Sequence, residues 1–336
     1  MNNNYILGID GGGTKTLVAI ADLNGKIVGT GQGGPANFDD VGISTVQANI
    51  ATAVAMACQQ ANLPQEPFAS VFLGMAGVVS THDHAIVRQI ALNLNLAEPE
   101  QIGIGHDCRI ALAGGLSGRP GIVLIVGTGS SCYGKTADGR EWRSGGWGHL
   151  ISDEGSSYWL GVQAMRTAVM VSDGRLPASM LLENVQRHFG LTETNDLMHR
   201  IYVQGLSRSE VAALAPLVIQ AAEAGDFPAQ ELIRHGTQDL AECVLAVADQ
   251  LGFSNTVSSA GCEVALVGGL LKAGDIYINP LRQAIHERLP YSQVRQAELP
   301  PVAGACLLAL KCLEITIDAA TIETLRGSVP LLGGKN

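Results

Sequence analysis

The stretch Asp10-Gly11-Gly12-Gly13-Thr14-Lys15-Thr16 decides the fold of this chain. It joins two short runs, residues 5–10 and residues 16–21, that are typical of β-strands. Glycines in such a hairpin allow several backbone N–H groups to point at one anion, and Thr14 and Lys15 add further donors. The stretch therefore predicts a phosphate-binding turn made by Gly12, Gly13, Thr14 and Lys15, with a plain glycine turn as the alternative.

The next segments of the chain predict an α/β domain. Leu23-Asn24-Gly25 separates residues 16–21 from residues 26–31, and an Asn-Gly pair between two β-rich runs is a strong hairpin signal. An opening meander followed by alternating helices and strands indicates a mixed sheet with helices on its faces. The expected strands are residues 70–75 and 101–105, and the expected helices are residues 44–61, 82–94 and 108–113.

The second part of the chain repeats this opening. After a glycine-rich linker at residues 114–121, an apolar strand leads into Gly127-Thr128-Gly129-Ser130 and then into a strand at residues 131–136. Ala137-Asp138-Gly139-Arg140 occupies the place of the first Asn-Gly turn. A duplicated fold explains the repeat, and two phosphate turns could bind one triphosphate. Helices at residues 155–171, 178–188, 228–251 and 302–315 and a strand at residues 264–267 complete the pattern.

Two other glycine motifs are excluded by the residues immediately after them. Residues 129–136 match the P-loop string, but a P-loop leads from a strand into a helix, and here a hairpin turn comes after Thr136. Residues 29–34 match the dinucleotide-binding string, but Pro35 and Asn37 stand where its helix would begin. Neither match therefore predicts a nucleotide site.

Two carboxylates lie at or near the ends of expected strands of the first half. Asp107 comes shortly after the strand at residues 101–105, where it could accept a proton from a sugar hydroxyl group. The alternative is that Asp107 is the N-cap of the helix at residues 108–113. Asp10, at the end of the first strand, could hold Mg²⁺ through water.

Two glycine-rich segments of the second half could also line a binding site. Gly145-Gly146-Trp147-Gly148-His149 leads to Asp153-Glu154, whose carboxylates could bind sugar hydroxyl groups. Alternatively, Asp153 or Ser152 caps the next helix. We interpret His149 as a core histidine or as a support for the site, and not as a metal ligand. Gly268-Gly269 could lie against an adenosine, or could let a helix pack closely on the preceding strand.

Composition and charge exclude several classes of partner. The chain has 336 residues, enough for two domains, and its 46% hydrophobic and 15% charged residues suit an α/β protein with a large core. A net charge of −10 argues against nucleic acid and anionic membranes, since both require a basic surface. The seven cysteines are scattered without a C-x-x-C pair, and the sequence shows neither a signal peptide nor a membrane-spanning run, so we expect a cytoplasmic protein.

Taken in order along the chain, these motifs resemble the BadF/BadG/BcrA/BcrD ATPase family. Gly8-Ile9-Asp10-Gly11-Gly12-Gly13-Thr14-Lys15-Thr16 is similar to its first phosphate motif, Gly127-Thr128-Gly129-Ser130 to its second, and Val267-Gly268-Gly269 to its adenosine motif. Residues 145–149 and 153–159 resemble the N-acetylglucosamine kinases within that family. The resemblance covers nearly the whole chain.

The resemblance implies an α/β protein with the two-domain, actin-like ATPase fold, a duplicated ribonuclease H-like fold with an interdomain cleft. The domains would be residues 1–117 and 118–336, and the closing helix could pack back on the first domain. The implied reaction is ATP-dependent phosphorylation of an amino sugar, N-acetylglucosamine above all, on its 6-hydroxyl group. ATP and Mg²⁺ would be the cofactors.

The resemblance also assigns roles to residues of this sequence. Asp107 matches the catalytic base, and Asp10 would hold Mg²⁺. The residues that would line the sugar pocket are Asn37, Gly77, Asp107, Thr128, Gly146 and Asp153. The residues that would bind ATP are Gly12, Gly13, Thr14, Lys15, Gly127, Thr128, Gly129, Ser130, Gly268 and Gly269.

Several related activities are alternatives. Glucosamine kinases belong to the same family and use the same turns. ATPases that activate a partner redox enzyme hold an iron–sulfur cluster on close-set cysteines, and ROK sugar kinases usually carry a tight cysteine cluster for zinc; this sequence has neither pattern. A sugar sensor without catalysis is disfavoured by the intact Asp10, Thr14 and Asp107. The expected partner is a small amino sugar, not nucleic acid or membrane, and the chain could form a homodimer as related kinases often do.

Overall fold

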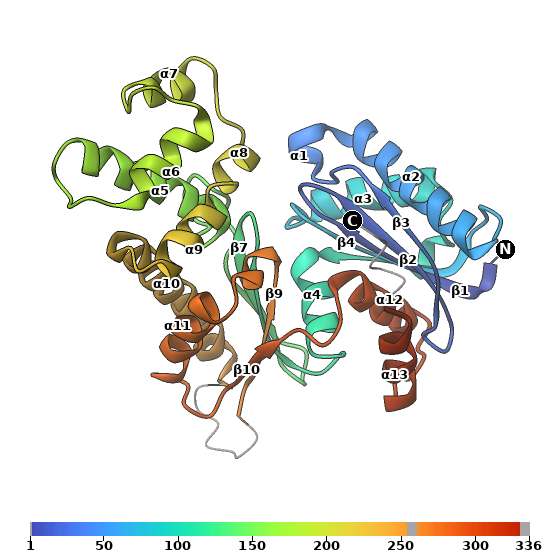
Figure 1. Cartoon of the computed structure of the whole chain (residues 1–336). Coiled ribbons are helices and arrows are strands. Elements are labelled where there is room, and N and C mark those ends of the chain that lie inside the picture. The colour runs from blue at the N-terminus through green and yellow to red at the C-terminus, as the bar shows by residue number, and fades with distance from the viewer. Residues whose placement is uncertain (1, 254–260, 330–336) are drawn as a thin grey trace. The chain divides into compact units, whose positions relative to one another are not determined.

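The chain forms two compact units, each built on its own five-stranded sheet (Figure 1). The computed structural model describes residues 2–253 and 261–329. Unit 1 comprises residues 1–120 together with residues 296–336, and unit 2 comprises residues 121–295. The C-terminal part of the chain therefore returns to the unit in which the chain begins.

The sheet of unit 1 opens with the predicted meander. Strands β1 (Asn2–Gly11), β2 (Thr16–Asp22) and β3 (Ile27–Gly33) are antiparallel neighbours, and β4 (Phe68–Met75) and β5 (Ile102–His106) continue the sheet parallel to β1. The strand order is β3-β2-β1-β4-β5. Since β1, β4 and β5 are parallel, their carboxyl ends lie at one edge of the sheet, the edge where ligands bind in many α/β folds.

Helices cover both faces of this sheet, as the alternation of buried side chains requires. Leu7 and Ile9 of β1 belong to the core formed with α2 (Ile43–Ala61) and α3 (Thr81–Asn93). Ile6, on the opposite face, packs with α12 (Pro301–Cys312) and α13 (Ala319–Ser328). Successive residues of a strand point to opposite faces, so β1 contributes to both cores. The remaining helical elements of unit 1 are α1 (Phe38–Val41), η1 (Pro99–Gln101) and α4 (Asp107–Gly115).

The rejected dinucleotide string has a packing role. A Cβ atom on Gly29, Gly31 or Gly33 would overlap a carbonyl oxygen of α2. Alternate residues of β3 face the same side, so these three glycines form a groove in which the backbone of α2 lies. The glycines are thus required by close helix–strand approach and not by a ligand.

The sheet of unit 2 has the same arrangement as that of unit 1. Strands β6 (Gly121–Val126), β7 (Ser130–Lys135) and β8 (Glu141–Gly145) form a meander, and β9 (Glu263–Val267) pairs parallel to β6. With β10 (Gln293–Gln296) the order is β10-β9-β6-β7-β8, which repeats the order of unit 1 when β6 is equated with β1. The predicted duplication is confirmed.

The helices of unit 2 pack into one core against this sheet. The expected helices are present as α5 (Ser157–Ser172), α6 (Met180–Phe189) and α10 (Phe227–Leu251). The sequence patterns did not predict α7 (Asp196–Tyr202), α8 (Arg208–Ala212), α9 (Ala215–Glu223), η3 (Gly269–Ala273) and α11 (Asp275–His286). Most of these are short, and periodicity is a weak signal over one or two turns.

All seven cysteines lie in the described ranges, where they form no disulfide, and five of them are buried. Within residues 2–253 and 261–329, every helix is too short or too polar to traverse a bilayer.

Candidate active site

The first glycine turn presents unpaired amides, as predicted. The Gly12 amide donates to the Lys15 carbonyl oxygen at 3.0 Å, and the Gly12 carbonyl oxygen accepts from the Ala36 amide at 2.9 Å. These bonds fix the turn, while the N–H groups of Gly13, Thr14 and Lys15 have no partner in the part of the chain that the structure describes. Exposed, convergent N–H groups of this kind bind anions.

Asp10 lies directly before this turn, at the carboxyl end of β1. The pKa of its carboxyl group is raised to about 7, chiefly by burial and also by the nearby Asp107, while Lys15 opposes the shift. Two carboxylates therefore repel each other at the edge of sheet 1. A divalent cation would relieve this repulsion, so the environment of Asp10 fits the predicted Mg²⁺ site.

Asp107 is the first residue of α4, immediately after β5. Its Oδ1 atom lies 2.6 Å from His106 Nδ1. Burial acts to raise the pKa of Asp107, but polar contacts with His106 and Cys108 outweigh it, and the pKa is lowered. Oδ1 is buried and makes no hydrogen bond of good geometry to the described residues. The side chain as a whole is 30% exposed, so Asp107 is an ionised acceptor that a ligand can reach.

The capping role considered for Asp107 belongs to its neighbour. His106 is the N-cap of α4, and its Nδ1 accepts the Cys108 amide at 3.2 Å. The alternative for Asp107 is therefore wrong. Strand β5 and helix α4 meet at His106 and Asp107, so the carboxylate is held at the edge that also carries Asp10.

Two predicted sugar ligands lie together beside the first turn. Asn37 caps α1, accepting the Asp39 amide at 3.3 Å and donating to Asp40 Oδ2 at 2.8 Å. A Cβ atom on Gly77 would lie 2.8 Å from Asn37 Oδ1, and the φ of +83° at Gly77 also favours glycine. Because Ala36 is hydrogen-bonded to Gly12, this pair adjoins the phosphate turn. Unit 1 therefore brings all its predicted site residues to one edge.

The second glycine turn comes after β6 and has the same design. The carbonyl oxygens of Gly127 and Thr128 accept the first two amides of α5, from Ser157 at 2.9 Å and from Tyr158 at 3.1 Å. The N–H groups of Thr128 and Gly129 have no partner among the residues that the structure covers. This turn also has free donors for an anion.

The Asp153 side chain is hydrogen-bonded to this turn. Asp153 is buried, with a φ of +67° that is rare outside glycine. Its Oδ1 accepts the Ser130 amide at 3.0 Å, and its Oδ2 accepts Arg208 Nη2 at 2.6 Å. The N-cap of α5 is Ser156, which accepts the Trp159 amide at 3.2 Å, so the capping alternative for Asp153 or Ser152 is wrong.

The segment between β8 and Asp153 begins beside the second glycine turn. Gly146 has a φ of +69°, and a Cβ atom there would lie 2.7 Å from Ser131 Oγ, so the position favours glycine. His149 is exposed and lies edge-on to Tyr158, with ring centroids 4.9 Å apart. The interpretation of His149 as a core histidine is wrong. Trp147 is exposed as well, with the Arg143 guanidinium 5.1 Å from its ring centroid.

Gly268 and Gly269 stand beside the second turn because β9 is parallel to β6. A Cβ atom on Gly268 would overlap the Val126 carbonyl oxygen, and its φ of +125° is open to glycine alone. Around Gly269, in contrast, no atom lies within 4 Å of a Cβ position. Gly268 thus has the packing role, and Gly269 leaves the open space that an adenosine would need.

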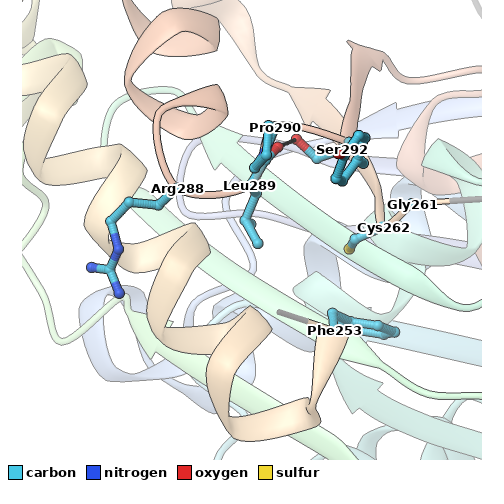
Figure 2. A pocket seen from close by; sticks show the side chains of 8 residues that line it. Phe253, Gly261, Cys262, Arg288, Leu289, Pro290 and Ser292 are labelled. Carbon is cyan, nitrogen blue, oxygen red and sulfur yellow. Dashed lines mark hydrogen bonds between the residues drawn. The ribbon is translucent and has the colours of Figure 1, made fainter. Parts of the chain in front are cut away.

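Two further features of unit 2 lie outside this site. Lys135, in the string that matches a P-loop, ends β7 and forms an ion pair with Glu141 of β8 at 2.7 Å, and a hairpin stands where a P-loop has a helix. The hollow in Figure 2, lined by Cys262 and Leu289 among others, adjoins the amino end of β9. Gly268 lies just beyond the opposite end of this strand, about 17 Å away for five residues.

Two sheets of one topology, each with a glycine-rich anion turn after its first strand, define the actin-like ATPase fold. The chain belongs to the BadF/BadG/BcrA/BcrD ATPase family, whose sequence profile matches residues 7–309.

Curated relatives and solved structures agree with this assignment. The chain is 30% identical to an N-acetylmuramic acid/N-acetylglucosamine kinase of Clostridium acetobutylicum, over 91% of this chain and 98% of the relative. It is 28% identical to an N-acetyl-D-glucosamine kinase of Dictyostelium discoideum, over 92% and 99%. The structure of a candidate N-acetylglucosamine kinase from Chromobacterium violaceum matches with a TM-score of 0.74 and 28% identity, over 92% of this chain and 100% of that one. A ROK family glucokinase from Streptomyces griseus shares the fold, with a TM-score of 0.58 and 19% identity, over 92% and 98%.

Proposed function

We propose that this protein transfers the γ-phosphoryl group of ATP to the 6-hydroxyl group of an amino sugar, with N-acetylglucosamine as the preferred acceptor. The observation that carries the proposal is Asp107, an ionised and partly exposed carboxylate at the edge of the sheet that also carries a phosphate turn. The two curated relatives above act on N-acetylated amino sugars by name, which supports the choice of acceptor.

The nucleotide would be bound by the two glycine turns. The free amides of Gly13, Thr14 and Lys15 from unit 1, and those of Thr128 and Gly129 from unit 2, provide donors for phosphate oxygens. Gly269 has the open space required beside an adenosine. Mg²⁺, when bound, would neutralise charge on the phosphates, and Asp10 is the residue that would hold it.

The sugar would be held by Asn37 and Gly77 of unit 1 and by Thr128, Gly146 and Asp153 of unit 2. The Asp107 carboxylate would accept the proton of the 6-hydroxyl group as the oxygen attacks phosphorus. The new P–O bond forms while the bond between the γ-phosphorus and the β,γ-bridging oxygen breaks, and ADP leaves. The protein's contribution is to position these groups and to stabilise charge, and proton transfer to Asp107 adds about 10²- to 10⁴-fold.

A coupled ADP-release assay with MgATP tests the proposal. It compares N-acetylglucosamine, glucosamine, N-acetylmuramic acid, glucose and no sugar. We expect strong stimulation by N-acetylglucosamine; preferential stimulation by glucosamine would instead identify a glucosamine kinase, the name of a Vibrio cholerae relative that is 28% identical over 73% of this chain and 80% of its own length. Turnover that no sugar changes would refute the kinase proposal.

The variant Asp107→Asn tests the proposed base. We expect sugar-dependent turnover to fall by about 10²- to 10⁴-fold while a non-hydrolysable ATP analogue still binds. Asp275→Asn is the matched control, because Asp275 is also the first residue of a helix, α11, and has no role in the mechanism. Unchanged turnover in Asp107→Asn would show that another group accepts the proton.

A further inference from the structure

An arginine that no motif predicted lies against the second glycine turn. Arg208, the first residue of α8, donates from Nη2 to Asp153 Oδ2 at 2.6 Å. A Cβ atom on Gly129 would lie 2.5 Å from the same Nη2 atom. The absence of a side chain at Gly129 therefore allows the guanidinium group to lie directly against the turn. Asp153 connects the two, since its other oxygen accepts the Ser130 amide.

The position of Arg208 is fixed by the elements around it. Helix α8 begins with a capping box in which Ser207 and Glu210 bond each other's amides, and Glu210 also pairs with Arg200. A Cβ atom on Gly161 of α5 would overlap the Val211 carbonyl oxygen, so α8 lies directly on α5. Helix α5 in turn donates its first amides to the glycine turn. The turn, α5 and α8 thus form one connected structure.

Arg208 keeps donors available on its accessible side. The guanidinium group has five N–H donors, and Asp153 engages only Nη2. Within residues 2–253 and 261–329, Nε and Nη1 of Arg208 have no partner, nor do the amides of Thr128 and Gly129. The Asp153 side chain is 4% exposed, whereas that of Arg208 is 40% exposed. The buried carboxylate therefore orients a guanidinium group that a ligand can still reach.

We propose that Arg208 binds the phosphate chain of ATP beside the second turn and that Asp153 positions it. A planar guanidinium group suits phosphate oxygens, and two free amides next to it add neutral donors. The inference rests on the proposed phosphate-binding role of this turn. It also explains how a chain with a net charge of −10 provides a cation for the nucleotide from unit 2. Asp153 can still accept a sugar hydroxyl group, because each carboxylate oxygen has two lone pairs.

Calorimetric titration with a non-hydrolysable ATP analogue, ADP and adenosine, all with Mg²⁺, tests the assignment. In Arg208→Gln we expect affinity for the ATP analogue to fall by about 10- to 100-fold, the usual effect of losing charge-assisted hydrogen bonds. Adenosine affinity should not change. Arg175→Gln is the control, because Arg175 also pairs with an aspartate at 2.6 Å, on the surface at Asp173. Arg208→Lys, which keeps the positive charge, should retain part of the affinity.

A double variant separates phosphate binding from simple neutralisation of Asp153. Asp153→Asn combined with Arg208→Gln removes both charges of the pair, so a thermal unfolding scan should show recovery of any stability lost in Arg208→Gln alone. If Arg208 binds phosphate, affinity for the ATP analogue stays low in the double variant. Recovery of that affinity, or equal losses for adenosine and the ATP analogue, would overturn the inference.

The outcome is independent of the sugar assay. Loss of analogue affinity in Arg208→Gln, in a protein that no sugar stimulates, would support Arg208 and refute only the kinase proposal. Unchanged affinity in a protein that phosphorylates N-acetylglucosamine would refute only the role of Arg208.

Discussion

Asp10 provides the clearest test of the electrostatics of the site. The ionised carboxylate that would hold Mg²⁺ destabilises the folded protein when no metal is bound. Its pKa is raised from the ordinary 3.8 to about 7 by burial and by Asp107. The unfolded chain therefore loses this proton near pH 4, while the folded protein keeps it until near pH 7. Between these values the folded state binds more protons, so stability falls as pH rises. We predict that Asp10→Asn abolishes sugar-dependent turnover and stabilises the metal-free protein.

The magnitude comes from the pKa difference. One pKa unit corresponds to about 1.36 kcal/mol, so ionised Asp10 lowers the free energy of unfolding by at most about 4 kcal/mol above pH 7. The side chain is partly exposed, and water screens part of this penalty. We therefore expect Asp10→Asn to gain about 2 to 4 kcal/mol at pH 8 and much less near pH 4.

Urea unfolding at pH 4.5 and pH 8 without Mg²⁺ measures this gain. Asp83→Asn is a control with the opposite sign, because hydrogen bonds from Ser80 and Val79 lower the pKa of Asp83. The Asp83 carboxylate stabilises the fold above its ordinary pKa of 3.8, and this contribution is lost only as pH falls below that value, so Asp83→Asn should destabilise the protein by nearly the same amount at pH 8 and at pH 4.5. An Asp10→Asn gain that is equal at both pH values, or a loss at pH 8, would refute the reasoning.

The metal provides a second measurement on the same variant. Mg²⁺ with ADP should raise the unfolding midpoint of the wild-type protein more than that of Asp10→Asn, since only the wild type has the carboxylate whose ionisation the cation favours. Asp107→Asn should lower the pKa of Asp10, because it removes the neighbouring negative charge. In that background the gain from Asp10→Asn should be smaller. An undiminished gain would mean that the two carboxylates are not coupled.

Two further changes test the glycine assignments. Gly31→Ala should destabilise unit 1 by about 1 to 3 kcal/mol in urea unfolding, because its Cβ atom would overlap the Ala53 carbonyl oxygen of α2, whereas Gly13→Ala, with no atom within 4 Å, should leave stability unchanged. Lys135→Ala should leave sugar-dependent turnover in place and cost less than about 1 kcal/mol, because it removes only a half-exposed ion pair with Glu141; complete loss of turnover would reinstate the P-loop.

The fold could be predicted because its decisive signals are local. An Asn-Gly turn and two glycine-rich turns each specify a hairpin within a few residues, and their repetition reveals the duplication without knowledge of any contact. The closeness of Asp10 and Asp107 follows from the strand order, since parallel strands bring their carboxyl ends to the same edge of the sheet. The half of the site that belongs to unit 1 could therefore be predicted from the sequence.

Capping residues and short helices were harder to predict. His106 and not Asp107 caps α4, and Ser156 and not Asp153 caps α5. Neighbouring polar residues satisfy the same capping preference. A small shift in where the helix begins therefore decides which of them is the N-cap and which remains available to bind a ligand. Helix α8 had a readable signal in Ser207 and Glu210, the ends of a capping box, but its five residues gave no periodicity.

The pairing of Asp153 with Arg208 shows which part of a site local patterns leave undetermined. The two residues are 55 positions apart, and the sequence between them forms α5, α6 and α7. A buried carboxylate requires compensation by a charge or by hydrogen bonds, so a cation for Asp153 could be expected in principle. Which arginine fills the role depends on how α8 packs on α5, through Gly161 and the backbone of Val211. The motifs therefore specify where phosphate can bind, whereas tertiary packing decides which cation reaches that place.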